Sequence, residues 1–189
     1  TSLVQVSPTA RTCEAYVVRV GAERTILIDD DGREVLDVTP PVAAALAAAD
    51  VVVTSPHELR QPALRTSVLA AHVGSTRIAM DIESAGLADP ELDAESVLAS
   101  SFLIINASAA AAVGLDLREL ARGDRTQASG AGRDIIVTRG AQGADIIGPE
   151  TDLHVPAIAV DPVDTTGASD TFFAAYLARR CAGASAADA

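Results

Sequence analysis

The sequence predicts an α/β fold, a doubly wound and mostly parallel sheet with helices on both faces, accompanied by a small β segment. Two observations predict it. From residue 37 onward, short continuous apolar runs alternate with helical patterns of about 10–15 residues, which is typical of βαβ units. Residues 1–36 instead combine β-forming residues with turn signals. We therefore expect a β segment over residues 1–36 and an α/β core over residues 37–189.

The β segment is expected to form a hairpin. Cys13–Val20 and Arg24–Ile28 are rich in β-forming residues, and residues 21–23 between them can turn. A second turn is predicted over residues 29–32, where three aspartates precede a glycine, and these acids are expected to be solvated.

The core begins with a helix start at Thr39, an N-cap residue followed by proline at the first helical position. Buried strands are predicted at residues 51–54, 77–80, 102–105 and 134–138. Helices are predicted at residues 42–49, 63–72, 94–100 and 171–180, with further helical segments between 107 and 121.

Composition limits the class of protein. The 189 residues are 49% hydrophobic and 21% charged, which excludes global disorder and is enough for one compact domain. All 14 basic residues are arginines against 26 acids, giving a net charge of −12 that argues against nucleic-acid binding. No transmembrane run and no signal peptide are expected. Two distant cysteines, Cys13 and Cys181, predict a reducing, cytoplasmic setting, although two cysteines could form a disulfide.

Polar residues end four of the predicted strands: Thr54, Asp81, Asn106 and Thr138. In open parallel sheets, ligands bind beyond the carboxyl ends of the strands, so these residues are expected to mark the functional edge.

A loop rich in small residues, Asp164–Asp170, runs directly into the last predicted helix. Small residues let backbone approach a ligand closely, and the first N–H groups of a helix lack internal partners and bind anions. Asp170 has two interpretations. It can compensate the helix dipole, as most first-turn acids do, or act as a general base beside the anion pocket.

The string Asp-Thr-Thr-Gly-Ala-Ser-Asp-Thr-Phe-Phe-Ala-Ala-Tyr-Leu over residues 164–177 closely resembles the second signature of the ribokinase-like (PfkB-type) carbohydrate kinase family. Residues 136–144 resemble that family's nucleotide segment, and residues 12–24 resemble the strands of its substrate lid. The resemblance begins well after the family's usual N-terminus. We therefore expect a fragment that lacks the N-terminal part and the C-terminal end.

The resemblance implies transfer of the γ-phosphoryl group of ATP, with Mg²⁺, to a hydroxyl of a sugar or nucleoside. Asp170 matches the catalytic base, and the backbone N–H groups of residues 167–169 match the anion hole. The three residues of that hole are Gly167, Ala168 and Ser169. Asp164 and Thr166 match positions that hold a monovalent cation such as K⁺. Thr138, Gly140, Gly143 and Asn106 match the nucleotide side. For the glycines, ordinary turn chemistry is the alternative. The family's lid strands can pair between subunits, so a homodimer is also implied.

This chain departs from the family pattern at two of its positions. Ser169 replaces the usual glycine before the base, and Ala109 replaces the glutamate of the family's Asn-x-x-Glu segment that begins here at Asn106. These departures keep open a rival hypothesis, a catalytically weak or inactive ligand-binding or regulatory protein. An unrelated doubly wound enzyme in which Asp170 is only a helix acid is a third.

Overall fold

One mixed sheet organises the computed structural model, which describes residues 3–9, 11–20, 23–29, 36–82, 94–113, 116–123 and 132–189. The strand order is β3-β4-β5-β6-β7-β8, with β3 to β6 parallel and β7 and β8 antiparallel. The strands are β3 (Val51–Thr54), β4 (Arg77–Ile82), β5 (Phe102–Asn106), β6 (Asp134–Thr138), β7 (Ala144–Ile147) and β8 (Asp152–Val155). The predicted α/β class with a mostly parallel sheet is confirmed.

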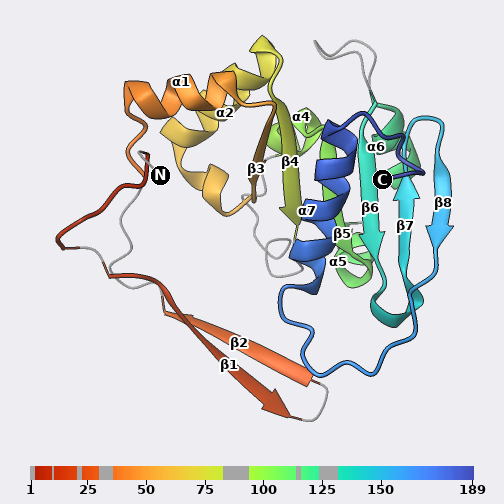
Figure 1. The fold of residues 1–189 in the computed structure, drawn as a ribbon. Helices are drawn as coiled ribbons and strands as arrows, with labels where there is room; N and C mark the ends of the chain where they lie inside the picture. Colours follow the sequence, from red (N-terminus) through yellow and green to blue (C-terminus); the bar gives the residue numbers. More distant parts are fainter. Residues whose placement is uncertain are drawn as a thin grey trace.

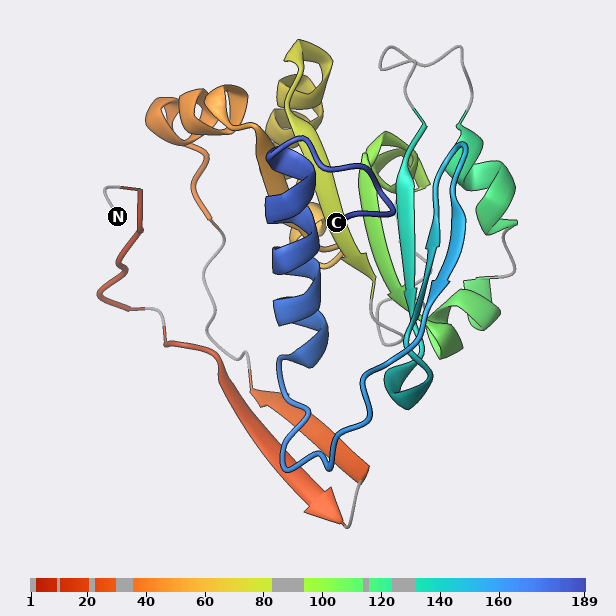
Figure 2. The same cartoon turned by 45° about the vertical axis from the view of Figure 1, so that its right-hand side comes forward.

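Helices cover both faces of this sheet (Figures 1 and 2). The connecting helices pack on one face, and the last helix packs alone on the other within the described part of the chain. They are α1 (Pro40–Ala48), α2 (Pro62–Gly74), α4 (Ala94–Ala99), α5 (Ala107–Val113), α6 (Leu117–Arg122) and, on the opposite face, α7 (Ala168–Cys181). Two short 3₁₀ turns, Glu58–Arg60 and Gly140–Gln142, follow β3 and β6. None of the helices in the described ranges is both long and apolar enough to cross a membrane.

Alternating side chains of the central strands supply two hydrophobic cores. In β5, Leu103 and Ile105 face the connecting helices, whereas Phe102 and Ile104 face α7. All four side chains are buried, as expected for a strand covered on both sides. This double burial accounts for the continuous apolar runs of β4, β5 and β6. The prediction that the strand at residues 51–54 is buried is wrong, because β3 lies at the edge of the sheet, none of its residues is buried and Val53 is 62% exposed.

The helix boundaries follow local capping chemistry. Helix α1 begins at Pro40 after an extended Thr39, as predicted, although the threonine side chain makes no capping bond. Helix α6 is capped by Asp116, whose Oδ1 accepts the N–H groups of Arg118 at 2.9 Å and Glu119 at 3.1 Å. The predicted region 107–121 thus contains two helices, α5 and α6.

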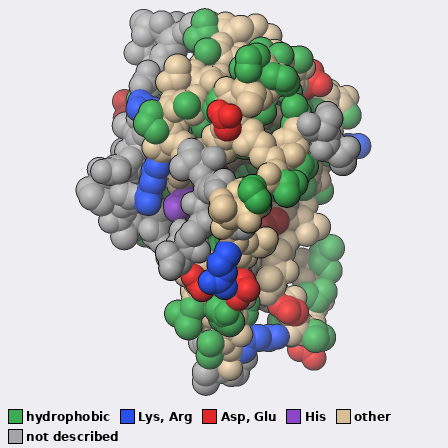
Figure 3. All heavy atoms as spheres, turned by 90° about the vertical axis from the view of Figure 1, so that its left-hand side faces the viewer, with side chains coloured by type: hydrophobic (Ala, Val, Ile, Leu, Met, Phe, Trp, Pro, Cys, Tyr) green, Lys and Arg blue, Asp and Glu red, His purple; other side chains and the backbone are tan. Residues whose placement is uncertain are grey.

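The predicted hairpin is present as a separate antiparallel pair, β1 (Glu14–Val20) and β2 (Glu23–Asp29). Of its predicted turns at residues 21–23 and 29–32, residues 21–22 and 30–32 lie outside the described residues, whereas Glu23 and Asp29 are the first and last residues of β2. Apolar side chains are exposed on both faces of the ribbon, because Tyr16 pairs with Leu27 and the next pair along, Val17 and Ile26, points the other way. Figure 3 shows hydrophobic side chains gathered on this projecting lower part of the molecule.

Strands β7 and β8 were not predicted. Each has only four residues, and β8 is mostly exposed. So short a run, next to glycines and without strong alternation, gives little periodic signal.

Candidate functional site

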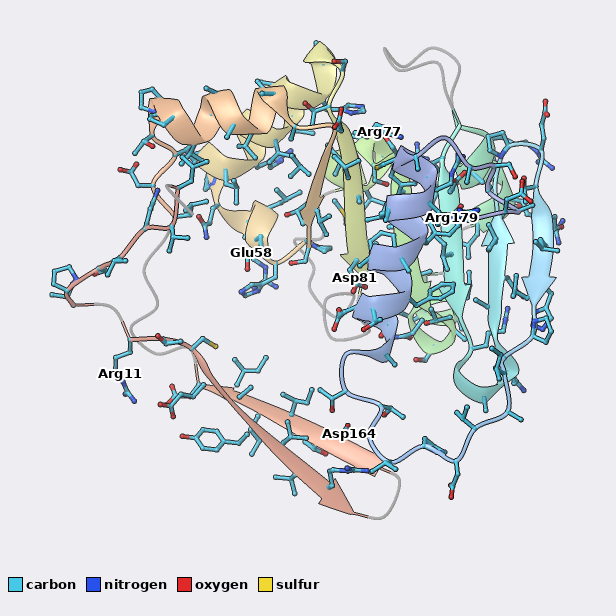
Figure 4. All side chains as sticks on the ribbon, viewed as in Figure 1. Arg11, Glu58, Arg77, Asp81, Asp164 and Arg179 are labelled. Atoms are coloured by element: carbon cyan, nitrogen blue, oxygen red, sulfur yellow. The ribbon has the colours of Figure 1, made fainter. Side chains whose placement is uncertain are left out.

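The carboxyl ends of the parallel strands meet at one edge of the sheet, which is the lower edge in Figure 1. Asn106 and Thr138 are direct register partners on β5 and β6. Asp81 lies near the end of β4, and Figure 4 shows it on the same side as the start of α7. The edge predicted from the strand-ending residues therefore also holds the loop that leads into α7.

Helix α7 begins at a tight left-handed turn. Gly167 has φ 75° and ψ 7°, a conformation that a residue without Cβ adopts without strain. Its carbonyl accepts the N–H of Thr171 at 2.9 Å and the Thr171 hydroxyl at 2.8 Å, so the first turn is closed internally. The backbone N–H groups of Gly167 and Ser169 have no partner among the described residues, whereas that of Ala168 donates to Thr165 at 3.2 Å. Two of the three predicted anion-hole amides are thus available.

Asp170 lies in the first turn of α7 with an exposed carboxylate. No described residue gives it a hydrogen bond or an ion pair. A Cβ placed on Gly167 would lie 3.8 Å from Oδ2 of Asp170, which puts the carboxylate beside the turn. A carboxylate that is open to solvent and adjacent to unpaired amides can meet both an anion and a hydroxyl group.

The loop before α7 is held by Asp164 and by the hairpin. Oδ1 of Asp164 accepts the N–H of Thr166 at 2.8 Å. Arg19 of β1 reaches across from the hairpin: its Nη2 donates to the carbonyl of Val163 at 3.1 Å, and its Nη1 lies 4.0 Å from Oδ2 of Asp164. Figure 4 shows Asp164 next to the end of the hairpin. The two segments are 144 residues apart in sequence, so no local pattern could have revealed the contact.

The two predicted nucleotide-side glycines differ. Gly140, with φ 56°, has open space where a Cβ would lie. Gly143, with φ 98°, would place a Cβ only 2.0 Å from the carbonyl of Val155, which is backbone. Gly143 is therefore required by the close approach of the segment after β8, whatever ligand binds. Thr138 is half-buried at the end of β6.

A charged cluster that the sequence did not predict lies beside this segment. Oδ2 of Asp145 accepts Nε of Arg139 at 2.6 Å, and its Oδ1 lies 2.7 Å from Nδ1 of His154. The hydrogen bond with His154 lowers the pKa of Asp145 below its ordinary value, and partial burial opposes this shift. The hydrogen bond and the positive charge of Arg139 lower the pKa of Asp145 further. Only the antiparallel pairing of β7 and β8 places Asp145 and His154 opposite each other.

Asn106 and Ala109, the first and last residues of the segment that departs from the Asn-x-x-Glu pattern, both have structural roles. Oδ1 of Asn106 accepts the Ser108 hydroxyl at 2.7 Å and the Ala109 N–H at 2.8 Å, so Asn106 caps α5. Ala109 is 0% exposed and packs in the core under the connecting helices. Across the ranges that the structure describes, no three His, Cys, Asp or Glu side chains gather to hold a metal ion.

Comparison with known proteins gives one family. The family model described as pfkB family carbohydrate kinase matches residues 1–189. The Bifunctional protein HldE of Caulobacter vibrioides is 28% identical over 198 residues, covering 97% of this chain and 39% of that protein.

Solved structures agree on the fold. Adenosine kinase from Anopheles gambiae, in complex with P1,P4-di(adenosine-5) tetraphosphate, has a TM-score of 0.75 and 20% identity, covering 96% of this chain and 60% of that one. A protein described as Ribokinase II from E. coli, in complex with ATP and Mg²⁺, has a TM-score of 0.70 and 19% identity, covering 94% and 60%. The chain thus spans 39% of the curated relative and 60% of these solved chains. Because the family model covers all 189 residues, the chain belongs to the pfkB family of carbohydrate kinases.

Proposed function

We propose that the full-length protein transfers the γ-phosphoryl group of the magnesium complex of ATP to a hydroxyl group of a sugar or nucleoside. The observation that carries this proposal is the start of α7, where two amides and a carboxylate that have no partner among the described residues lie within one turn of backbone. Membership of the pfkB family supports the reaction class.

Asp170 would act as the general base. A base must be unprotonated, reachable and not already engaged, and the Asp170 carboxylate is exposed and unpaired within the described part of the chain. It would accept the proton of the acceptor hydroxyl as the oxygen attacks phosphorus.

The N–H groups of Gly167 and Ser169 would stabilise the charge that develops on the transferred group, assisted by the positive end of the 14-residue helix α7. Ala168 would join them only if its 3.2 Å bond to Thr165 opens. Asn106, Thr138, Gly140 and Gly143 would border the nucleotide. Of these, the position of Gly140 leaves open space beside the backbone.

No cluster of acids in the described ranges forms a protein cage for Mg²⁺. This donor set fits a magnesium ion that arrives as part of the ATP complex and is held by phosphates and water. A monovalent cation at Asp164 and Thr166 is a finer proposal, and the guanidinium of Arg19 already brings positive charge to within 4.0 Å of Asp164.

The hairpin would cover the acceptor, and Arg19 would hold it to the loop before the base through Val163 and Asp164. Arg19→Met is therefore expected to raise the KM for the acceptor more than it lowers kcat. The exposed Arg11 on the same segment offers the matched control Arg11→Met. Equal KM values in both variants would contradict this role of Arg19.

The apolar side chains on both faces of the hairpin also suggest that one face covers the acceptor and the other pairs with a second copy. We propose a homodimer through this ribbon, to be tested by sedimentation of the protein with Tyr16→Ser. Both cysteines are free and exposed, which is compatible with the reducing cytoplasm that we propose as the location.

Asp170→Asn in the full-length protein is the decisive test of the kinase. Loss of the general base is expected to lower kcat by about 10²–10⁴-fold with little change in nucleotide affinity. ADP release would be measured against pentoses, hexoses, phosphosugars and nucleosides. Turnover by the variant at the wild-type rate would refute the assignment.

The alternative is a weak or inactive ligand-binding member of the family. It is favoured by the buried Ala109, which leaves no carboxylate at that position, and by Ser169 in the loop. Thermal stabilisation by nucleotide and sugar without ADP release from any acceptor would support this alternative over the kinase.

A further inference from the structure

A hollow of about 480 Å³ lies at the opposite edge of the sheet, near the amino ends of the parallel strands. It is bordered by the end of α2, the starts of β4, β5 and β6, and Arg180 near the end of α7. Figure 4 shows this separation on one strand: Arg77 is at the upper end of β4 and Asp81 at the lower end. The hollow is therefore distinct from the edge that carries Asp170.

Its lining is cationic, although the chain carries a net charge of −12. Among the described residues that line it are three guanidinium groups, those of Arg77, Arg133 and Arg180, and one carboxylate, that of Asp134. Oδ2 of Asp134 accepts Nε of Arg180 at 2.6 Å and the hydroxyl of Tyr176 at 2.8 Å. Asp134 therefore compensates Arg180, and the other two arginines are left without a carboxylate partner in the described part of the chain.

Of these two arginines, Arg133 has the greater need for a compensating negative charge, because it is only 6% exposed. Its Nη1 and Nη2 donate to the carbonyls of Val97 at 3.0 Å and Leu98 at 2.8 Å, at the end of α4. Its Nε is buried and has no hydrogen-bond partner among the residues that the structure describes. Burial lowers the pKa of Arg133, but a guanidinium stays charged at neutral pH. A buried charge that meets only carbonyl dipoles is stabilised further by an anion.

The guanidinium of Arg77 is held in place by uncharged groups, and no carboxylate of the described residues neutralises it. Its guanidinium lies 5.5 Å from the centroid of the Phe102 ring, and that of Arg180 lies 6.0 Å from the same centroid. Its Nη2 also donates to Sγ of Cys181 at 3.5 Å. The strained backbone of Ser75, with φ 124°, places a further hydroxyl-bearing residue at the rim.

We propose that this hollow binds a small molecule carrying a phosphate group. Two uncompensated guanidinium groups match the charge of a phosphate dianion, and their planar donors fit its oxygens. The volume lies within the usual range for small-molecule sites. The bound phosphate would link Arg133 to Arg77, and so join β6 to β4.

Calorimetric titration of the full-length protein with inorganic phosphate, at constant ionic strength set by chloride, tests this site. Arg77→Met is expected to weaken the phosphate-dependent binding by about tenfold to hundredfold, because a charge-assisted hydrogen bond is lost. Arg179→Met is the matched control, since Arg179 adjoins Arg180 on α7, is exposed and does not line the hollow.

Binding lost in Arg77→Met and retained in Arg179→Met supports the site. Identical isotherms for both variants and wild type, or no saturable phosphate binding by wild type, would overturn it. Arg133→Met is not used as the test variant, because Arg133 also holds the end of α4 and its loss can disturb the fold. Arg77 is the better choice, since its side chain is half-exposed and makes no ion pair in the described part of the chain. Neither result depends on kinase activity.

Discussion

Removing one hydroxyl group from Tyr176 is the sharpest test of how α7 is fixed to the sheet. The Tyr176 side chain is 2% exposed, and its ring packs in the core beneath α7. Its hydroxyl donates to Oδ2 of Asp134 at 2.8 Å, an oxygen that also accepts Nε of Arg180. Tyr176→Phe keeps the ring and deletes only this donor.

The magnitude follows from the burial of the acceptor. Asp134 is 4% exposed, so water cannot readily replace the lost donor, and a hydrogen bond to a charged group contributes about 1.5–3 kcal/mol. The retained bond from Arg180 keeps the carboxylate partly satisfied, which places the expected loss near 2 kcal/mol. For a domain of this size that corresponds to a Tm lower by about 4–8 °C.

Urea unfolding of the full-length protein, followed by far-UV circular dichroism, would measure the change. Tyr16→Phe is the control, because Tyr16 makes the same kind of bond to Glu14, at 2.6 Å, but on the exposed hairpin. That bond is expected to contribute much less than the Tyr176 bond, because water readily replaces a hydrogen bond between two exposed side chains. Equal free energies of unfolding for the two variants would refute the claim that burial makes the Tyr176 bond strong.

The same residue predicts an alkaline effect. Burial, and secondly the Asp134 carboxylate, raises the pKa of Tyr176 above its ordinary value of 10.0. In the unfolded chain the phenol ionises first, so its contribution is complete below pH 10 and is lost as the pH rises toward the folded-state pKa. Wild type should therefore lose stability more steeply above pH 10 than Tyr176→Phe, and parallel curves would contradict this.

Two further predictions concern the segment after β6. The hydrogen bond with His154 lowers the pKa of Asp145 below its ordinary value of 3.8. The Asp145 carboxylate therefore stabilises the fold at pH values above 3.8, and this contribution is lost as the pH falls toward the lower pKa of the folded state. Thermal unfolding between pH 7 and pH 3 should show a smaller loss for Asp145→Asn than for wild type, and equal losses would exclude the pair as a source. Gly143→Ala should greatly lower the yield of folded protein, since its Cβ would lie 2.0 Å from the Val155 carbonyl. Gly74→Ala, which meets no atom within 4 Å, should be neutral or slightly stabilising, and similar Tm values for both would disprove the clash.

Local patterns were enough to predict most of the core. Residues 51–54 and 134–138 form strands over the predicted ranges, and α2 and α7 extend beyond their predicted bounds by one to three residues at each end. These elements were predictable because each is specified by its own residues: continuous runs of mostly β-branched residues for the strands, and helix formers for the helices. Such a run does not distinguish β6, which is buried, from β3 at the edge of the sheet, where Val53 is 62% exposed. Strands β7 and β8 escaped because four residues carry too little periodicity.

The sequence by itself determined the α/β class, the edge at which the strands end, and the loop that starts α7, because strand polarity and helix capping are properties of neighbouring residues. The tertiary structure alone decided which distant groups meet. It brought Arg19 to Asp164, His154 to Asp145, and Arg77, Arg133 and Arg180 around one hollow. Such contacts are set by strand order and by the face on which each helix packs, and no spacing along the chain encodes them.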